Sequence, residues 1–257
     1  MKKAIIGGTG VYDGGEPLRQ EQVDTKYGAV EVDVVALASG EEVAFLARHG
    51  KGHSVPPHRI NYRANLKALQ QLGVEQVLAT AAVGSLNPNL PPSALVLTTD
   101  FIDATRQRPL TFFEGDDGNV RHVGMEEPYC PVLRERVLLQ AQRSEELVEE
   151  SGVYVCTEGP RFETTAEIRM YRNWGADVVG MTNIPEVVLA RELGMCYATL
   201  CLVVNMATGM KSSPITMDEI NRVIGGCRDR AIRLLLDTLA QPDPPRSCAC
   251  NRAAMAL

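Results

Sequence analysis

Apolar and polar positions along the chain alternate between short hydrophobic runs and longer amphipathic stretches. Short apolar or alternating runs, typical of β-strands, occur at residues 3–6, 30–36, 43–46, 76–83, 94–99, 153–156, 178–181 and 197–205. Apolar positions at helical spacing predict helices at residues 61–72, 131–150, 165–174, 185–192 and 217–239. Thr164 with Glu167, and Thr216 with Glu219, have the spacing of helix caps and predict where two of these helices begin.

The order of these elements predicts the fold class. Strands and helices alternate from residue 60 to 240, which indicates an α/β fold: a single domain with a central mixed, mainly parallel sheet flanked by helices. After Leu239 the chain becomes polar and rich in proline. We therefore expect residues 1–240 to form the domain and residues 241–257 to form a C-terminal tail.

Composition narrows the classes of function. The 257 residues are 45% hydrophobic and 23% charged, as in ordinary globular proteins. A net charge of −6 argues against broad binding of nucleic acid or anionic membranes, but it does not exclude a small anion held in a local pocket. No apolar run approaches the ~18 residues of a transmembrane helix. The first apolar stretch is cut short by glycines before it reaches the length of a signal peptide, so a cytoplasmic location is expected.

The seven cysteines fall into two groups. Five are scattered, mostly within apolar segments, and are expected to be buried free thiols: Cys130, Cys156, Cys196, Cys201 and Cys227. Cys248 and Cys250 form a Cys-x-Cys pair in the polar tail; the sequence leaves the role of this pair open, and two free thiols in a loose tail are one interpretation. Because the chain has no CxxC pair, no structural zinc is predicted, and no metal ligands are assigned.

Two glycine-containing segments are candidate anion sites. Residues 7–10 read Gly-Gly-Thr-Gly directly after the first strand, so backbone N–H groups and the Thr9 hydroxyl can approach an anion, although a simple turn is the alternative. The dinucleotide fingerprint fails here, because its last glycine position is Asp13. Arg48, His49, Lys51 and His53 concentrate donors on one loop, which favours an oxyanion over a metal ion or a merely solvated loop.

Four further segments place small or polar residues where strands end or helices begin. They are residues 80–85, 159–163, 180–186 and 200–205. Ligands of open α/β sheets gather at the carboxyl ends of strands, so these junctions are candidate binding positions. Each segment alone is ambiguous, because small residues also serve helix–sheet packing and an acidic residue at a helix start can simply complement the helix dipole.

Taken together and in this order, these segments resemble the trimeric purine nucleoside phosphorylase and methylthioadenosine phosphorylase family. The resemblance runs from about Lys3 to Leu239 and rests on the motifs GGTG, RHG, NYRAN, EGPRFET and WGADVVGMTNIPEVVLARELG. It implies the nucleoside phosphorylase fold and cleavage of the N-glycosidic bond of a purine nucleoside by inorganic phosphate. It also implies a homotrimer or a dimer of trimers, with no metal or organic cofactor.

The resemblance also implies a set of site residues. Phosphate would be held by Thr9, Arg48, His49, the backbone around Ala81 and Ala82, and Thr182. The nucleoside would contact Phe162, Glu163, Met181, Asn205 and His53. Asn205, Glu163 and His49 are the residues expected to act in catalysis.

The residues expected at the base predict which purine is accepted. Branches of the family that accept 6-aminopurines have an Asp-x-Asp after the last sheet strand, whereas this chain reads Asn205-Met206-Ala207. A carboxylate at Glu163 accepts a hydrogen bond from N1–H of a 6-oxopurine but faces the N1 lone pair of adenine. We therefore expect inosine- or guanosine-type substrates, with a 5′-methylthioadenosine phosphorylase or a non-catalytic purine-binding protein as alternatives.

The 5′ end of the nucleoside is left open by the sequence. Phosphorylases that resemble the mammalian 6-oxopurine enzymes use a histidine here, but this chain has none after His122. Residues 212–217 read Ser-Ser-Pro-Ile-Thr-Met, and an apolar wall in this region would suit a 5′-methylthio group as in methylthioinosine.

Overall fold

A twisted sheet of eleven strands forms the centre of the computed structural model, which describes residues 1–11, 15–50, 52, 54–116, 118–211 and 214–256. Eight strands follow one another across the sheet: β2 (Arg19–Thr25), β3 (Gly28–Ala36), β4 (Glu42–Ala47), β1 (Lys3–Gly7), β5 (Gln76–Ser85), β11 (Val178–Gly180), β10 (Val153–Thr157) and β7 (Asp100–Ala104). β12 (Cys196–Met206) branches from β5 and continues into β6 (Leu95–Leu97) and β9 (Val148–Glu149). Most pairs in the centre of the sheet are parallel, as predicted, whereas β11 pairs antiparallel with β5, and β2, β3 and β6 also join antiparallel.

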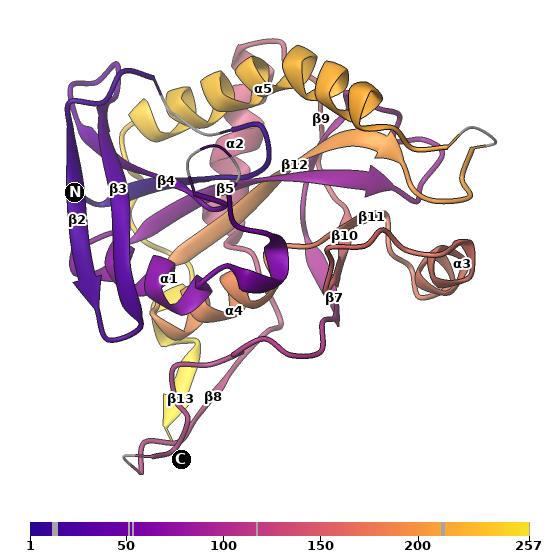
Figure 1. The fold of residues 1–257 in the computed structure, drawn as a ribbon. Helices are drawn as coiled ribbons and strands as arrows, with labels where there is room; N and C mark the ends of the chain where they lie inside the picture. Colours follow the sequence, from indigo (N-terminus) through magenta and orange to yellow (C-terminus); the bar gives the residue numbers. More distant parts are fainter. Residues whose placement is uncertain (12–14, 51, 53, 117, 212–213, 257) are drawn as a thin grey trace.

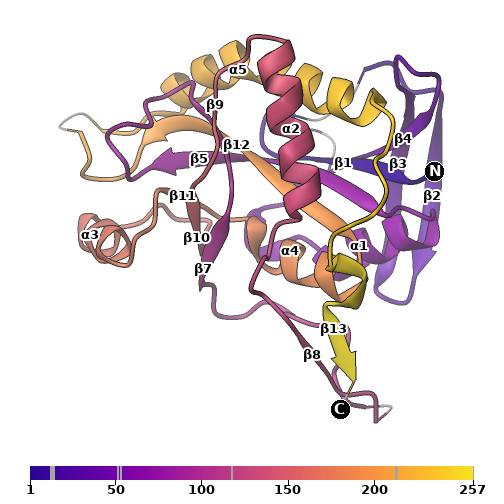
Figure 2. The same cartoon turned by 180° about the vertical axis from the view of Figure 1, so that it is seen from behind.

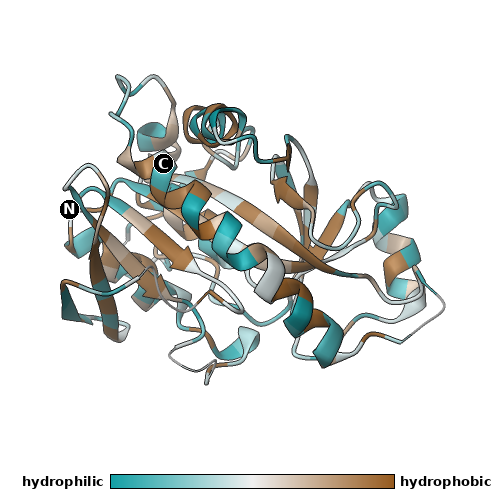
Figure 3. Ribbon diagram, turned by 90° about the horizontal axis from the view of Figure 1, so that it is seen from above, coloured by the Kyte–Doolittle hydropathy of each residue, from teal (hydrophilic) through white to brown (hydrophobic). Residues whose placement is uncertain are grey.

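Helices cover both faces of the sheet, which gives three layers (Figure 1). α2 (Pro131–Arg143) and α5 (Met217–Ala240) pack on one face, and α1 (Tyr62–Gln71) and α4 (Asn183–Glu192) pack on the other. α3 (Thr165–Asn173) stands apart at one end of the sheet. Figure 3 shows α5, with its alternating hydrophilic and hydrophobic stretches, lying across strands that are mostly hydrophobic. The α/β fold expected from the sequence is confirmed.

Side chains cap the starts of three helices, two of them at the predicted residues Thr164 and Thr216. The Asn61 side chain accepts a hydrogen bond from the Ala64 N–H at the start of α1. Thr164 and Glu167 form a complete capping box on α3. Thr216 accepts from the Glu219 N–H at the start of α5. Each cap satisfies an N–H group that the first helical turn leaves without a partner.

The helix predicted at residues 131–150 is too long. α2 ends at Arg143, and after Ser144 the backbone turns through Glu145, which has a φ of 53°. Val148 then enters β9, parallel to β6, while Leu147 is 86% exposed. The charged sequence of residues 144–150 does not distinguish a helix from a turn. Val148 is held in place by its pairing with β6, which is distant in sequence.

The C-terminal segment packs against the domain. Asp243 pairs with Arg136, in the middle of α2, at 2.9 Å and with Lys3, the first residue of β1, at 3.5 Å. Cys248 and Cys250 are buried, and β13 (Ala254–Ala256) pairs antiparallel with β8 (Arg121–Val123). Figure 2 shows this segment running beside α2 and down to β13. The expectation of loose tail thiols is therefore wrong, whereas the five scattered cysteines are buried as predicted.

None of the helices in the described part of the chain combines the length and the apolar character that crossing a membrane would need.

Candidate active site

A cavity of about 350 Å³ lies where β1, β4, β11 and β12 reach their carboxyl ends. This volume is within the range of small-molecule sites, and its position matches the rule for ligands of open α/β sheets. Its walls include residues from every segment that the sequence singled out: Thr9, His49, Ala82, Phe162, Glu163, Met181, Thr182 and Asn205.

One side of the cavity is built to receive an anion. The Gly8 N–H donates to the Thr80 hydroxyl at 2.8 Å, which fixes the turn that presents Thr9. A Cβ atom at Gly8 would lie 2.6 Å from the Thr80 carbonyl oxygen, so only glycine fits this approach. Thr182 lines the cavity at the N-cap position of α4, without a side-chain capping hydrogen bond, and the non-helical backbone at Ile184 places the regular helix further along the chain.

His49 has a defined tautomer in this arrangement. Its Nδ1 lies 2.9 Å from the Val55 carbonyl oxygen, which can only accept, so Nδ1 carries the hydrogen. An anion in the cavity would therefore meet Nε2. That atom donates to a phosphate oxygen when the ring is protonated, or accepts from a phosphate hydroxyl when the ring is neutral.

Arg48 lies behind the cavity wall instead of lining the cavity. Its Nε and Nη2 donate to the two carboxylate oxygens of Glu186, each at 2.6 Å, and Nη1 donates to the Thr80 carbonyl at 2.7 Å. Both members of the pair are buried. The Cβ position of Gly8 is 2.9 Å from Arg48 Nη1, so the guanidinium lies directly beneath the glycine turn.

A buried polar network holds this pair in place. The Tyr197 hydroxyl donates to Glu186 Oε1 at 2.7 Å, and the Asn183 amide donates to the Tyr129 hydroxyl at 2.8 Å. Thr199 donates to Asn183 Oδ1 at 3.0 Å. Because buried charges are tolerated only when they are paired and hydrogen-bonded, this network fixes Arg48 and the start of α4 together.

The opposite side of the cavity carries the two residues predicted to read a purine. Asn205 lies near the end of β12, just after a β-bulge: Val203 pairs with Val83 and Asn205 pairs with Gly84, so Val204 is the extra residue. Side chains normally alternate between faces, but the bulge lets Val204 and Asn205 both line the cavity. The Asn205 amide donates to the Met206 carbonyl at 2.8 Å, which limits its rotation.

Glu163 is buried beside the start of α3. The Thr157 hydroxyl donates to its Oε1 at 2.7 Å. Burial raises the pKa of Glu163 above its usual value, and the Thr157 hydrogen bond partly opposes that rise. The carboxyl group therefore changes its hydrogen-bonding character closer to neutral pH than an exposed glutamate would.

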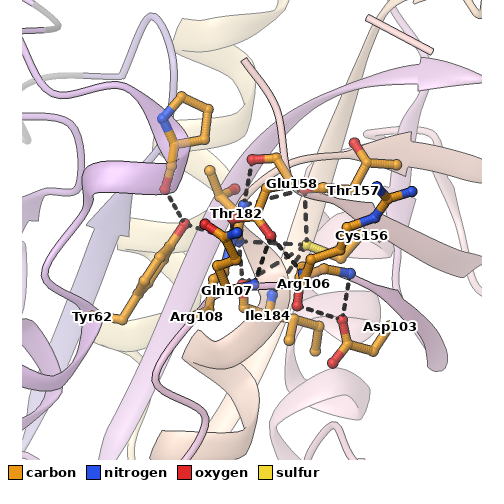
Figure 4. A network of polar contacts seen from close by, with 12 residues as sticks. Tyr62, Asp103, Arg106, Gln107, Arg108, Cys156, Thr157, Glu158, Thr182 and Ile184 are labelled. Atoms are coloured by element: carbon orange, nitrogen blue, oxygen red, sulfur yellow. Dashed lines mark hydrogen bonds and ion pairs between the residues drawn. The ribbon is translucent and has the colours of Figure 1, made fainter. Parts of the chain in front are cut away.

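Arg108 connects chain segments near Glu163 through hydrogen bonds, and Figure 4 shows the contacts of Arg108 itself. It is buried, and its Nη2 donates to the carbonyl oxygens of Thr157 and Glu158 at 3.1 and 2.9 Å. Its Nη1 reaches the Ile184 carbonyl and, at 3.3 Å, the Tyr62 hydroxyl. One guanidinium thus connects the end of β10, the start of α4 and the start of α1.

Comparison with known proteins decides the family. The model of the phosphorylase superfamily matches residues 2–240. The chain belongs to this superfamily. The resemblance inferred from the motifs is confirmed, and the superfamily match covers every cavity residue named above.

Individual relatives of this phosphorylase are similar over nearly their whole length. The chain is 48% identical to a 6-oxopurine nucleoside phosphorylase from Pyrococcus furiosus, over 97% of this chain and 96% of the relative. It is also 48% identical to a probable S-methyl-5′-thioinosine phosphorylase from Methanopyrus kandleri, over 97% and 96%. A methylthioadenosine phosphorylase from Schistosoma mansoni, solved with adenine, superposes with a TM-score of 0.88 at 32% identity, covering 93% of this chain and 91% of that chain.

The structure brings most of the expected site residues of this phosphorylase together, with qualifications for three of them. Arg48 is paired with Glu186 and does not line the cavity, so its direct contact with phosphate stays a prediction. The Ala81 side chain is buried in the core, and only the backbone at this position was expected to contribute. His53 lies outside the described residues, as does Lys51 of the same loop.

Glu186, Thr157 and Arg108 are functional supports of the phosphorylase that the sequence reasoning missed. Glu186 left a signal, because a carboxylate just before the apolar run 187–190 needs a buried cation if that face of the helix is buried. Arg108 left none, since its partners come from distant segments, and the hydrogen bond from Thr157 to Glu163 has no recognisable sequence pattern.

Proposed function

We propose that this chain catalyses the phosphorolysis of 6-oxopurine nucleosides, freeing the purine base and forming ribose 1-phosphate. The observation that carries the proposal is one cavity lined both by Thr9, His49 and Thr182, the residues expected at phosphate, and by Glu163 and Asn205, the residues expected at the base. The names of the Pyrococcus furiosus and Methanopyrus kandleri relatives support the same substrate class.

In the proposed transition state, positive charge develops on the sugar and negative charge develops on the purine base. As the bond from C1′ to the purine nitrogen breaks, its electron pair goes to the base and the sugar becomes oxocarbenium-like. The phosphate oxygen that then bonds to C1′ also stabilises this cation. Asn205 donates toward O6 or N7 of the departing base, while ionised Glu163 accepts from N1–H. No covalent nucleophile, metal or organic cofactor is required, and inorganic phosphate is the co-substrate.

A 5′-methylthio group is the second candidate feature of the substrate. Ile215, Met217 and Ile220 line the cavity and form the apolar wall that the sequence suggested. Methylthioinosine would bury its methyl group there, whereas inosine would place a hydroxyl group against the same wall. We therefore include 5′-methylthioinosine among the proposed substrates.

A turnover panel tests the proposal. Inosine, guanosine, adenosine, 5′-methylthioinosine and 5′-methylthioadenosine are each assayed with and without phosphate. We expect phosphate-dependent release of hypoxanthine or guanine. A higher kcat/KM for 5′-methylthioinosine than for inosine would support a 5′-methylthio group as a feature of the preferred substrate.

Other results of the panel would contradict the proposal in different ways. Base release without phosphate would make the protein a nucleosidase. Purine binding without turnover at saturating phosphate would make it a binding protein. Predominant turnover of 6-aminopurines would overturn the roles of Glu163 and Asn205 while leaving the phosphate site intact.

We also propose a homotrimer or a dimer of trimers. The support is an exposed hydrophobic set near the cavity and on α3: Phe162, Met170 and Trp174. Light scattering coupled to size exclusion should give a mass of three or six chains, and a monomer would contradict the assembly.

A further inference from the structure

Four cysteines from distant parts of the chain converge at the end of the molecule opposite the cavity. Cys130 is the N-cap of α2, Cys196 begins β12, and Cys248 and Cys250 lie in the C-terminal segment. Their exposed fractions are 1%, 7%, 8% and 1%, and their sulfur atoms all lie within 4.8 Å of one another. The sequence argument against zinc looked for ligands close together in the chain, so it could not register this cluster.

The spacing of the sulfurs fits metal coordination. Zinc bound by four thiolates has Zn–S bonds of about 2.3 Å, which places the sulfurs about 3.8 Å apart in a tetrahedron. The Sγ atoms of Cys196 and Cys248 are 3.4 Å apart, and no pair exceeds 4.8 Å. Shifts of about an ångström or less would therefore complete the tetrahedron, and all four cysteines are free thiols in the structure.

The surroundings of the cluster favour thiolates. Cys130 occupies the N-cap position of α2, where the N–H groups of the first helical turn favour negative charge. Arg191 is buried and donates from Nη1 to Cys250 Sγ at 3.7 Å. Its Nε has no hydrogen-bond partner among the described residues.

A second cation lies on the other side of the cluster. Arg246 shares a cavity of about 190 Å³ with Cys130, Cys196 and Cys248. Zinc with four thiolates carries a net charge of −2, and Arg191 and Arg246 together carry +2. Outer partners of this kind orient the ligands and offset the charge of the centre, and the cavity provides an entry path for the ion.

We propose that Cys130, Cys196, Cys248 and Cys250 bind one structural Zn²⁺ ion. Four sulfur ligands select a soft or borderline cation, and a complete set of four leaves no open position for catalysis. Binding replaces the thiol protons with the metal and transfers no electrons. The ion fastens the C-terminal segment to the starts of α2 and β12.

The test is the metal content of the full chain purified under reducing conditions without added chelator. We expect about one zinc per chain, released when a mercurial reagent modifies the thiols. Replacement by Co²⁺ should give the visible absorption of a tetrahedral cobalt–thiolate centre. The double variant Cys248→Ser/Cys250→Ser should lose zinc by about tenfold or more, whereas Cys227→Ser, which removes a buried cysteine outside the cluster, should keep it.

Three outcomes would overturn the proposal. One is a pair of disulfides, seen as a mass deficit and a lost thiol titre without reduction. Another is four metal-free thiols after incubation with Zn²⁺, and the third is stoichiometric iron. Measurements on the natural chain decide between these outcomes even if the double variant fails to fold, and none of them bears on phosphorolysis.

Discussion

At the scale of single residues, Glu163 is a hydrogen-bond acceptor when ionised and a donor when protonated. Its protonation state therefore decides which purine edge it matches. The ionised form suits N1–H of a 6-oxopurine, and the protonated form suits the bare N1 of a 6-aminopurine. Burial places this change at a higher pH than in an exposed glutamate.

The preference for 6-oxopurines should accordingly fall as the pH falls. Above the raised pKa of Glu163 the carboxylate accepts from N1–H of inosine; below it, the protonated carboxyl accepts from N1–H more weakly and gains an O–H that can donate to N1 of adenosine. The measurement is the ratio of kcat/KM for inosine to that for adenosine between pH 8 and pH 5. Titration of phosphate affects both substrates and cancels in this ratio.

Two variants control the pH experiment. Thr157→Val removes the hydrogen bond that lowers the pKa of Glu163, so the midpoint of the change should move to higher pH. Glu163→Gln should make the ratio independent of pH. A midpoint that stays in place in Thr157→Val would contradict the assigned positioning role of Thr157.

Asn205→Asp should shift the relative preference toward 6-aminopurines. The substitution keeps the shape of the side chain but replaces a donor facing O6 with an acceptor. A hydrogen bond to a charged group is worth about 1.5–3 kcal/mol, so the inosine-to-adenosine ratio should fall by about 10–150-fold. Steady-state kinetics of both substrates provide the test, and an unchanged ratio would refute the role given to Asn205.

Much of the site could be predicted from the residue types at strand ends. The residues that hold the site residues in position could not be predicted. Thr182 and Asn205 follow recognisable buried strands, and parallel strands bring such positions to one edge. The pairing of Arg48 with Glu186 spans 138 positions in sequence, and no local pattern encodes it. The donors gathered on the loop and the family resemblance therefore assigned Arg48 to phosphate, whereas the structure also gives it a carboxylate partner.

At the scale of elements, close packing at the end of β11 is a strict requirement. A Cβ atom at Gly180 would lie 2.0 Å from the Tyr154 hydroxyl oxygen, and Tyr154 is fully buried. The strand would have to move, and Met181 and Thr182 would move with it.

Gly180→Ala should lower the free energy of unfolding by about 1–3 kcal/mol and reduce turnover, because overpacking forces backbone shifts. Gly225→Ala is the matched control, since Gly225 lies within α5 with nothing within 4 Å of its added Cβ. That variant should be more stable by about 0.5–1 kcal/mol. Denaturant unfolding of both variants is the measurement, and equal stabilities would contradict this account.

Elements with an apolar pattern were predictable, and those without one were not. The start of α3 followed from its capping box, and β12 followed from its continuous apolar run. β2 reads Arg-Gln-Glu-Gln-Val-Asp-Thr, is largely exposed, and exists because β3 supplies its hydrogen bonds. Tertiary pairing of this kind overrides local propensity.

At the scale of the whole molecule, the C-terminal segment acts as part of the domain. Removal of residues 241–257 would expose core side chains that Cys248 and Cys250 cover, and would leave Arg136 and Lys3 without Asp243. We expect a lower Tm and a loss of at least about 2 kcal/mol of stability, from apolar burial alone. Calorimetry of the shortened chain is the check, and an unchanged Tm would mean that the segment is dispensable.

The amino and carboxyl ends of the central strands serve different functions. β12 begins at Cys196 beside the C-terminal segment and reaches the cavity at Asn205, and β1 likewise runs from Lys3 toward Thr9. Substitutions at the amino ends of these strands change how stably the C-terminal segment packs on the domain. Substitutions at the carboxyl ends change which ligand the cavity binds. Heat tolerance and substrate choice are therefore separable traits that different substitutions can adjust independently.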